Sequence, residues 1–398
     1  EDTSEAWRTW EKSHQSYRGP YSDSVNLSGR VLQGLTFVPT GAIVAAPTTS
    51  LPEAVGGERN WDYRYSWVRD ASFTLDALWV AACPDEERSY FRYLATAASS
   101  VHHRRQLQIM FGISGERDLT ERELPWLEGW RRSRPVRVGN GAWDQAQSDV
   151  YGELLAVAHR LRDLLEPFDG PLRRLLVTVT EVASSVWTQP DHGIWEMRDE
   201  PRHHLYSKLM CWVALDRAVE MAGQLQAEER IESWRRTRDE IAEAIVTQGW
   251  NETVGAFTQS FGSDVLDASA LVIPIVGFLP AHDKRVLSTI EAVEAHLMGP
   301  SGLVHRYRSD DGLAGEEGAF VLCSFWLAHA LALAGRVVRA REVFDITVGY
   351  ANDVGLLAEE IDPATGAHLG NFPQAFSHIG LINAAWAIDE AERGAGSR

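Results

Sequence analysis

The sequence predicts an all-α fold, a closed (α/α)6 barrel of about twelve helices whose pocket is formed by six long loops at one end. Hydrophobic residues recur at spacings of three and four along the whole chain, whereas the alternation typical of β-strands is nearly absent. Long polar segments also alternate with short turns, and antiparallel helices then bring every long loop to the same end. An open solenoid of helical repeats is the competing architecture, but no residue motif recurs at a fixed period.

Each predicted helix is an apolar stripe bounded by turn or capping residues. Between residues 171 and 187, for example, Leu172, Leu175, Leu176 and Val179 share one face, and Pro171 occupies the favoured first position. The same criterion places helix starts near Ser24, Arg69, Glu86, Asp149, Pro171, Leu205, Ala227, Asp267, Lys284, Ala319, Val337 and Gln374.

The connections between helices indicate where function lies, because long loops in compact domains usually carry function. The six long loops cover approximately residues 36–68, 113–148, 188–204, 249–266, 298–318 and 352–373. Residues 1–23 are expected to form a helical lead-in that packs against a barrel domain of residues 24–398. A connection to a segment further upstream is the alternative interpretation of this lead-in.

Composition and charge restrict the class of function. The chain of 398 residues is 44% hydrophobic and 24% charged, which is typical of a soluble globular protein. Its net charge of −18 argues against nucleic acid and anionic membranes as partners, and no apolar run reaches the roughly 20 residues of a membrane span. A homo-oligomer is compatible with this composition.

The cysteines and histidines give no sign of a metal or a disulfide framework. Cys83, Cys211 and Cys323 lack any CxxC spacing and are expected to be reduced thiols of a cytoplasmic protein. Adjacent histidines, as at 102–103 and 203–204, cannot direct both rings to one helix face. No phosphate-binding glycine motif occurs, so neither a metal nor a cofactor is expected.

Two of the long loops carry glutamates in settings that suit acid–base chemistry. Glu196 follows Trp195 in GIWEMR, and Glu359 lies in GLLAEEID. Hydrolysis of a glycosidic bond uses two carboxyl groups on opposite sides of a pocket, and an apolar neighbour such as Trp195 favours the protonated form of the acid. Most glutamates are solvated surface charges, which is the competing interpretation for each of them.

The first long loop ends in RNWDYRYSWVRDAS, from Arg59 to Ser72, which is dense in aromatic and charged residues. Tyr63 and Trp67 can form a wall of a sugar pocket, and Arg69 with Asp70 can hydrogen-bond neighbouring sugar hydroxyls. A helix-capping aspartate beside a surface arginine would give the same pair.

Seven blocks of the sequence resemble glycoside hydrolase family 15, which contains glucoamylases, glucodextranases and bacterial trehalases. The blocks occur in the family's order over nearly the whole chain, and the resemblance implies a ring of six helix pairs. They are GAIVAAPTTSLPE from Gly41, NWDYRYSWVRDA from Asn60, NGAWDQAQSDVYGE from Asn140, GIWEMR from Gly193, SKLMCWVALDRA from Ser207, GLLAEE from Gly355 and GNFPQAFSHIGL from Gly370.

The resemblance also implies roles for individual residues. Glu196 matches the family's general acid, and Glu359 matches its general base, where many members have glutamate followed by glutamine and this chain has Glu360. Whether Tyr63 takes part in proton transfer or only shapes the pocket is open. The implied substrate-binding residues are Tyr63, Trp67, Arg69, Asp70, Trp143, Asp149, Trp195, Arg306, Phe376 and His378.

The expected function is an inverting, exo-acting hydrolase that releases β-glucose from the non-reducing end of a small α-glucoside. Its two carboxyl groups would stand roughly 6.5 to 9.5 Å apart, which leaves room for the attacking water. Bacterial members of the family commonly have a β-sandwich domain before the barrel, and this sequence shows none. A short substrate such as isomaltose or a malto-oligosaccharide is therefore expected.

Three alternative functions remain open at the level of sequence. A trehalase of the same family is the nearest, because GLLAEE and GNFPQAFSH also resemble bacterial trehalases. A non-catalytic carbohydrate-binding protein would need the aromatic pocket alone. A phosphorolytic enzyme on a similar barrel would use phosphate and would lack the basic carboxylate.

Overall fold

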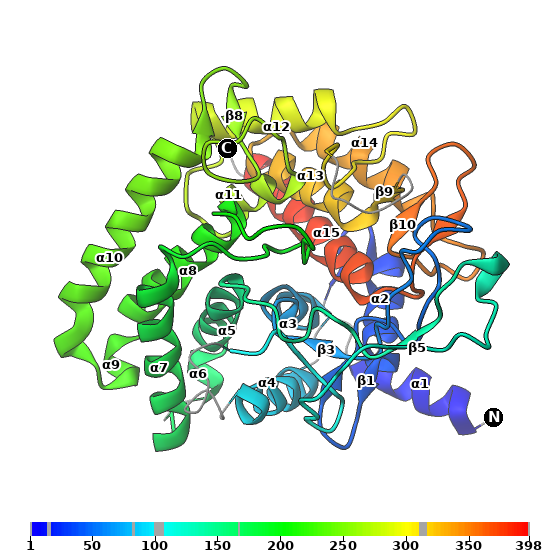
Figure 1. The fold of residues 1–398 in the computed structure, drawn as a ribbon, viewed down its shortest axis with the longest axis horizontal. Helices are drawn as coiled ribbons and strands as arrows, with labels where there is room; N and C mark the ends of the chain where they lie inside the picture. The colour runs from blue at the N-terminus through cyan, green and yellow to red at the C-terminus, as the bar shows by residue number, and fades with distance from the viewer. Residues whose placement is uncertain are drawn as a thin grey trace.

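The computed structural model describes residues 2–13, 17–81, 84–98, 107–165, 168–309 and 317–396. Inner and outer helices alternate along the chain and form a ring of helix pairs (Figure 1). The all-α fold class and the (α/α)6 barrel predicted from the sequence are thereby confirmed.

Six inner helical elements surround the centre of Figure 1. Each packs against the next, and the last packs against the first, so the ring is closed and the open solenoid is excluded. The inner elements are α3 (Ala71–Val80), α5 (Asp149–Arg160), α8 (Leu205–Glu220), the short η5 (Ala268–Leu271) with α11 (Val272–Ile275), α13 (Val321–Leu333) and α15 (Ala375–Gly396).

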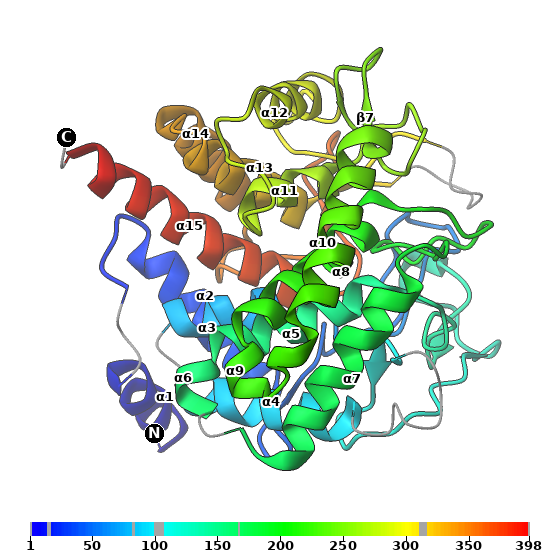
Figure 2. The same cartoon turned by 90° about the vertical axis from the view of Figure 1, so that its left-hand side faces the viewer.

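The outer helices cover this ring, and Figure 2 shows α7 and α10 on the outside of α5 and α8. They are α2 (Ser22–Gly34), α4 (Pro84–Ala98), α7 (Gly170–Val186), α10 (Ile231–Ala244), α12 (Lys284–His296) and α14 (Val337–Val348). The remaining helical segments are α1 (Asp2–Ser13), α6 (Arg162–Leu165), α9 (Ala222–Leu225), η2 (Trp130–Arg132), η3 (Glu228–Arg230) and the π-helical turn η4 (Ile245–Gly249).

Local signals fix where several helices begin. The Asp169 side chain accepts a hydrogen bond from the Leu172 N–H at 2.8 Å at the start of α7, and Asp283 accepts one from the Arg285 N–H at 2.8 Å before α12. Such caps satisfy N–H groups that have no partner inside the helix. The helix starts predicted from the sequence lie within about four residues of the observed ones.

Short strands in the long loops are the feature that the sequence analysis missed. In the part of the chain that the structure describes, each named strand has two residues, which is one period of β alternation and too short to recognise in a sequence. Antiparallel pairs join β1 (Thr36–Phe37) to β2 (Ala42–Ile43), β3 (Ser66–Trp67) to β4 (Met110–Phe111), β5 (Arg122–Glu123) to β6 (Arg137–Val138), and β7 (Trp250–Asn251) to β8 (Ala256–Phe257).

One three-stranded sheet carries a predicted catalytic segment. Strand β10 (Glu360–Ile361) pairs in antiparallel register with β9 (Ala319–Phe320) and with β11 (His368–Leu369). Glu360 therefore lies opposite both Phe320 and Leu369 in the centre of the sheet. Its neighbour Glu359 precedes β10 and is positioned by this sheet.

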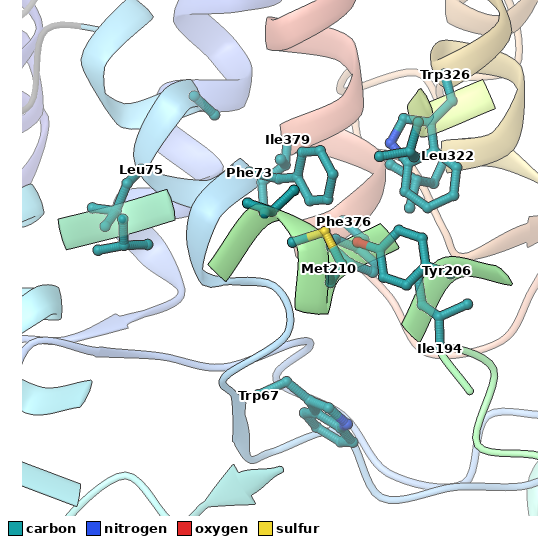
Figure 3. Packing of buried hydrophobic residues seen from close by; sticks show 14 of the residues in the cluster. Trp67, Phe73, Leu75, Ile194, Tyr206, Met210, Leu322, Trp326, Phe376 and Ile379 are labelled. Atoms are coloured by element: carbon teal, nitrogen blue, oxygen red, sulfur yellow. The ribbon is translucent and has the colours of Figure 1, made fainter. Parts of the chain in front are cut away.

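The inner helices enclose an apolar core beneath the loops. Helix α13 is apolar around its whole circumference because it contacts helices on several sides. Figure 3 shows Phe73 from α3, Met210 and Tyr206 from α8, and Phe376 and Ile379 from α15 gathered together, with Trp67 and Ile194 below them in the view. The long loops therefore pack on a well-packed apolar core.

No helix in the described part of the chain combines the length and apolarity needed to cross a membrane. Cys211 and Cys323 are buried free thiols. Cys83, His102 and His103 lie outside the described residues.

Candidate active site

Two adjoining pockets lie among the long loops. The inner pocket has a volume of about 430 Å³ and the outer one about 540 Å³, including the open solvent at their mouths. Tyr63, Trp195, Glu196 and Arg306 line both pockets, whereas Glu359 lines only the inner one. Glu196 therefore stands at the boundary between the two spaces.

A tight turn presents Glu196 to the pockets. Its backbone has φ +58°, a left-handed conformation that costs a residue other than glycine about 1 kcal/mol or more. The turn starts at Gly193, where an added Cβ would lie 2.7 Å from the ring of His204. Such strain persists where the surrounding structure imposes it, and it concentrates at functional sites.

Two donors hold the Glu196 carboxylate. The indole N–H of Trp67 donates to Oε1 at 2.6 Å, and Nη1 of Arg69 donates to the same oxygen at 3.0 Å. Both contacts fix the position of this oxygen at the pocket wall. Trp195, the apolar neighbour expected from the sequence, lines both pockets together with Glu196, and its Nε1 donates to Asp267 at 2.9 Å.

Glu359 is buried in the wall of the inner pocket. The Tyr63 hydroxyl donates to its Oε1 at 2.7 Å, and its Oε2 has no hydrogen-bond partner in the described part of the chain. Gly370, with φ +75°, makes room for that oxygen, since a Cβ there would lie 2.6 Å from it. A carboxylate oxygen without a partner is free to accept a proton.

The electrostatic setting of Glu359 suits a base near neutral pH. Burial raises the pKa of Glu359 to about 7, against the opposing effects of the Tyr63 hydrogen bond and of Arg306. The charge of Glu196 also contributes to raising this pKa, so the two carboxylates sense each other across the inner pocket. Burial and the charge of Glu359 raise the pKa of Tyr63 well above its usual range, which keeps its phenol protonated.

Arg69 and Asp70 lie side by side in the inner pocket. Nε of Arg69 donates to Asp70 Oδ1 at 3.0 Å, and the guanidinium group lies 5.4 Å from the ring centroid of Phe376. Burial raises the pKa of Asp70 to about 6, and Arg69 opposes that rise. The Asp70 side chain caps no backbone N–H of α3, so the capping interpretation of this pair is not what the structure shows.

The inner pocket brings most of the predicted site residues together. Its lining contains Tyr63, Trp67, Arg69, Asp70, Trp195, Glu196, Arg306, Glu359 and Phe376, along with Ala45, Ile194, Phe320 and Gln374.

Trp143, Asp149 and His378 are absent from the lining of both pockets. Asp149 is fully buried at the start of α5, where burial raises its pKa to about 7 and the charge of Arg69 opposes the rise. Trp143 is half-buried and packs against the core from its turn. A match between sequence blocks identifies a position but does not give the direction of its side chain.

His378 supports the backbone that carries Glu359. Its Nε2 accepts a hydrogen bond from the Leu357 N–H at 3.2 Å, so Nδ1 carries the ring proton and donates to Ser28 Oγ at 2.9 Å. Burial lowers the pKa of His378 to about 3, which keeps the ring neutral. The Ser377 hydroxyl adds a bond to the Ala358 carbonyl at 2.7 Å.

Several residues of the outer pocket were missed in the sequence. Glu53, Arg59, Trp61, Arg198 and Glu317 line it, and only their final positions bring them together. Four of them belong to or adjoin family-like blocks, since Glu53 ends the first block, Arg59 directly precedes the second, Trp61 lies in the second and Arg198 ends GIWEMR. The blocks thus marked these positions, but nothing in the sequence assigned them a function.

A cluster of carboxylates lies beside this pocket. One oxygen each of Glu53, Glu317 and Glu360 lie within 4.8 Å of one another, a spacing that can hold a cation. Two guanidinium groups already supply positive charge there, because Arg59 Nη1 donates to Glu317 at 2.5 Å and Arg306 Nε donates to it at 3.1 Å. Burial raises the pKa of Glu53 and of Glu360 well above the usual range. Protonation therefore limits the charge of the cluster, and a metal would compete with two arginines.

Comparison with known proteins finds matches over nearly the whole chain. A family model described as "Glycosyl hydrolases family 15" matches residues 30–386. A protein named "Trehalase" from Mycolicibacterium smegmatis is 45% identical over 400 residues, which cover 99% of this chain and 59% of that protein. A "Trehalase" from Thermoplasma acidophilum is 40% identical over 391 residues, covering 98% of this chain and 66% of its own length. The chain thus spans about three-fifths of the length of these relatives.

Solved structures share the fold at low sequence identity. A protein titled "Glycosidase Wild Type" superposes with a TM-score of 0.73 at 20% identity, covering 92% of this chain and 96% of the other. The glucoamylase from Saccharomycopsis fibuligera has a TM-score of 0.68 at 15% identity, with coverages of 96% and 98%. At these identities the comparison establishes the architecture.

Proposed function

Since this chain belongs to glycoside hydrolase family 15, we propose that it hydrolyses α,α-trehalose, a disaccharide of two glucose units, to two glucose molecules. The observation that carries the proposal is the position of Glu196 at the boundary of two adjoining pockets, with Glu359 in the inner pocket alone. The relatives named trehalase favour trehalose over the isomaltose or malto-oligosaccharide expected from the sequence.

In the proposed reaction the inner pocket holds the glucose unit that is attacked, and the outer pocket holds the unit that leaves. Protonated Glu196 gives its proton to the oxygen between the two rings as the bond from C1 to that oxygen breaks. Glu359 takes a proton from a water molecule, whose oxygen bonds to C1 from the opposite face. In this reaction the acid must reach the oxygen between the two sugar rings, and the base must reach only the ring in the inner pocket. The proposal is supported by Glu196 lining both pockets and Glu359 lining only the inner one.

The other inner-pocket residues position the substrate and the base in this proposal. Arg69 and Asp70 offer donors and an acceptor to the hydroxyls of the inner glucose, and Trp67, Trp195 and Phe376 form its walls. Tyr63 orients Glu359 through its hydrogen bond and stays protonated. Arg306 lines both pockets and holds Glu317.

We assign supporting roles to the three predicted site residues that lie outside the pockets. Trp143 and Asp149 stabilise the loop and the start of α5 behind Arg69, and His378 supports the segment before Glu359.

The substrate is tested by measuring glucose release from trehalose, isomaltose and maltose side by side. Trehalose is expected to have the highest kcat/KM, and Glu196→Gln and Glu359→Gln are each expected to lower kcat about 10²- to 10⁴-fold, the usual contribution of a general acid or base. Faster hydrolysis of isomaltose or maltose would instead support the short α-glucoside expected from the sequence. Formation of glucose 1-phosphate would indicate phosphorolysis, and sugar binding without turnover would indicate a binding protein.

A further inference from the structure

A stack of two arginines on one tryptophan forms part of the wall of the outer pocket. The Arg198 guanidinium carbon lies 4.2 Å from the ring centroid of Trp61, and that of Arg137 lies 4.8 Å from the same centroid. Arg137 is nearly fully buried and donates through Nη1 to the carbonyl oxygens of Glu58 and Asn60, at 2.8 and 2.9 Å. The tryptophan is thereby fixed from one side by a rigid arginine.

One carboxylate links the two arginines of this stack. Glu121 Oε1 lies 3.1 Å from Arg137 Nε, and its Oε2 lies 3.6 Å from Arg198 Nη2. Glu121 is itself held, because the backbone N–H of Gly141 donates to Oε2 at 3.0 Å. Trp61 and Glu121 together restrict Arg198 to one orientation beside the outer pocket.

Arg198 differs from the other two arginines that line the outer pocket. Arg59 and Arg306 both donate to Glu317 at hydrogen-bond distance. The 3.6 Å contact of Arg198 with Glu121 is longer than a hydrogen bond, and in the described part of the chain its N–H groups donate to no protein atom. Its side chain is 38% exposed, so its donors are oriented but still available.

We propose that Arg198 is a specificity-determining residue that recognises the second sugar ring of the substrate in the outer pocket. This inference rests on the proposed function, in which that pocket receives the departing glucose. Arg198 lines the outer pocket and not the inner one. A planar guanidinium group with a fixed orientation can donate two parallel hydrogen bonds to neighbouring hydroxyl oxygens, which selects a ring by the spacing of its hydroxyls.

The test compares trehalose with α-D-glucopyranosyl fluoride, whose leaving group is a single atom and which therefore needs only the inner pocket. Arg198→Ala is expected to lower kcat/KM for trehalose about 10- to 100-fold, chiefly through a higher KM, because donors to the second ring are lost. Hydrolysis of the fluoride is expected to stay within about twofold of the unmodified protein. For Arg198→Lys we expect a kcat/KM for trehalose between those of the unmodified protein and of Arg198→Ala, since an ammonium group keeps the charge but not the planar pair of donors.

Two further variants separate recognition from folding. Glu121→Gln weakens the ion pair that orients Arg198, so it is expected to raise the KM for trehalose while the fluoride kinetics stay unchanged. Arg202→Ala is the matched control, because Arg202 is a partly exposed arginine of the same long loop, pairs with Asp199 at 2.6 Å and lines neither pocket. It should leave the kinetics with both substrates unchanged.

Equal losses on trehalose and on the fluoride in Arg198→Ala would overturn the proposal, because they would place the effect at Glu196 or in folding. Unchanged trehalose kinetics in Arg198→Ala and Glu121→Gln would overturn it as well. Failure of the proposed function has a different signature, namely that the unmodified protein hydrolyses the fluoride but not trehalose. The same comparison is then made with the disaccharide that the protein hydrolyses fastest, and it tests Arg198 in the same way.

Discussion

The hydrogen bond from Tyr63 to Glu359 lowers the pKa of the proposed base toward the neutral range. Burial raises the pKa of the Glu359 carboxyl group, and the hydrogen bond that the Tyr63 hydroxyl donates at 2.7 Å opposes this rise, as does the charge of Arg306. The raised pKa of Tyr63 means that the phenol donates this bond throughout the neutral range. Tyr63 is therefore best described as a residue that orients and stabilises the base.

Replacing this hydroxyl should move the acid limb of the pH profile. Activity requires ionised Glu359 and is lost as the pH falls through its pKa, which is about 7 in the folded protein. Tyr63→Phe removes a contact that lowers this pKa, so the pKa rises and the acid limb of kcat against pH shifts to higher pH. A limb that stays in place, or moves to lower pH, would show that Tyr63 does not act through Glu359.

Residues of the site could be predicted from the sequence where adjacent positions are fixed by one local element. Arg69 and Asp70 are such a pair, because β3 and α3 on either side hold them at the inner pocket. Arg198 and Glu53 could not be predicted, since their place in the outer pocket depends on how separate loops cross. His378 belongs to a matching block, yet its ring turns away from the substrate space toward Ser28 and Leu357.

At the scale of elements, the first turn of α15 and the residue before it hold the segment that contains Glu359, the proposed base. The Gln374 N–H donates to the Leu357 carbonyl at 3.0 Å, and the Val321 N–H at the start of α13 donates to the Glu359 carbonyl at 3.0 Å. Together with the contacts of His378 and Ser377, these bonds connect residues 357–359 to two inner helices, α13 and α15. The base is thus placed by helices, which are more rigid than the loop that contains it.

Removing the imidazole should slow the reaction without weakening substrate binding. His378→Ala is expected to lower kcat about 10- to 100-fold with little change in KM, because the base loses its support while the inner pocket keeps its walls. Added imidazole, which fits the space left by the ring, should restore part of kcat. His329 on α13 is the matched control, since burial lowers its pKa to about 4 and it contacts neither pocket. Its replacement by alanine should cost stability, and imidazole should not raise kcat.

Element boundaries followed from the sequence for helices and not for strands. A helix such as α7 shows several turns of apolar spacing, a capping Asp169 and Pro171, so it is specified locally. Strand β10 has two residues, and it pairs with β11, which follows it after a short turn, and with β9, which comes from a distant part of the chain. Nothing within Glu360 and Ile361 themselves specifies that pairing.

At the scale of the whole molecule, the closed ring gives the reaction a fixed direction. The inner ends of the loops surround one pocket, and a second pocket adjoins it on the side of Glu196. In the proposed reaction, water activated by Glu359 attacks the sugar in the inner pocket from the side opposite to the departing sugar. This geometry predicts the stereochemistry of both products.

Trehalose should give equal amounts of α-glucose and β-glucose at the start of the reaction. The inner unit is inverted to the β-anomer, whereas the departing unit keeps its α configuration because its own bond to the anomeric carbon is not broken. Proton NMR of the anomeric hydrogens, recorded before mutarotation, measures the ratio directly. Two α-anomers would indicate retention and would contradict the roles given to Glu196 and Glu359.

The closure of the ring by α15 affects the order in which the protein can fold during synthesis. Ribosomes make the chain from its N-terminus, so the helix that seats Glu359 and packs against α3 emerges after every other inner helix. A nascent chain that stops before residue 375 carries both carboxylates but lacks His378 and Ser377 to hold the second one. In the proposed mechanism, the site around Glu359 is therefore complete only after α15 has docked on the other inner helices.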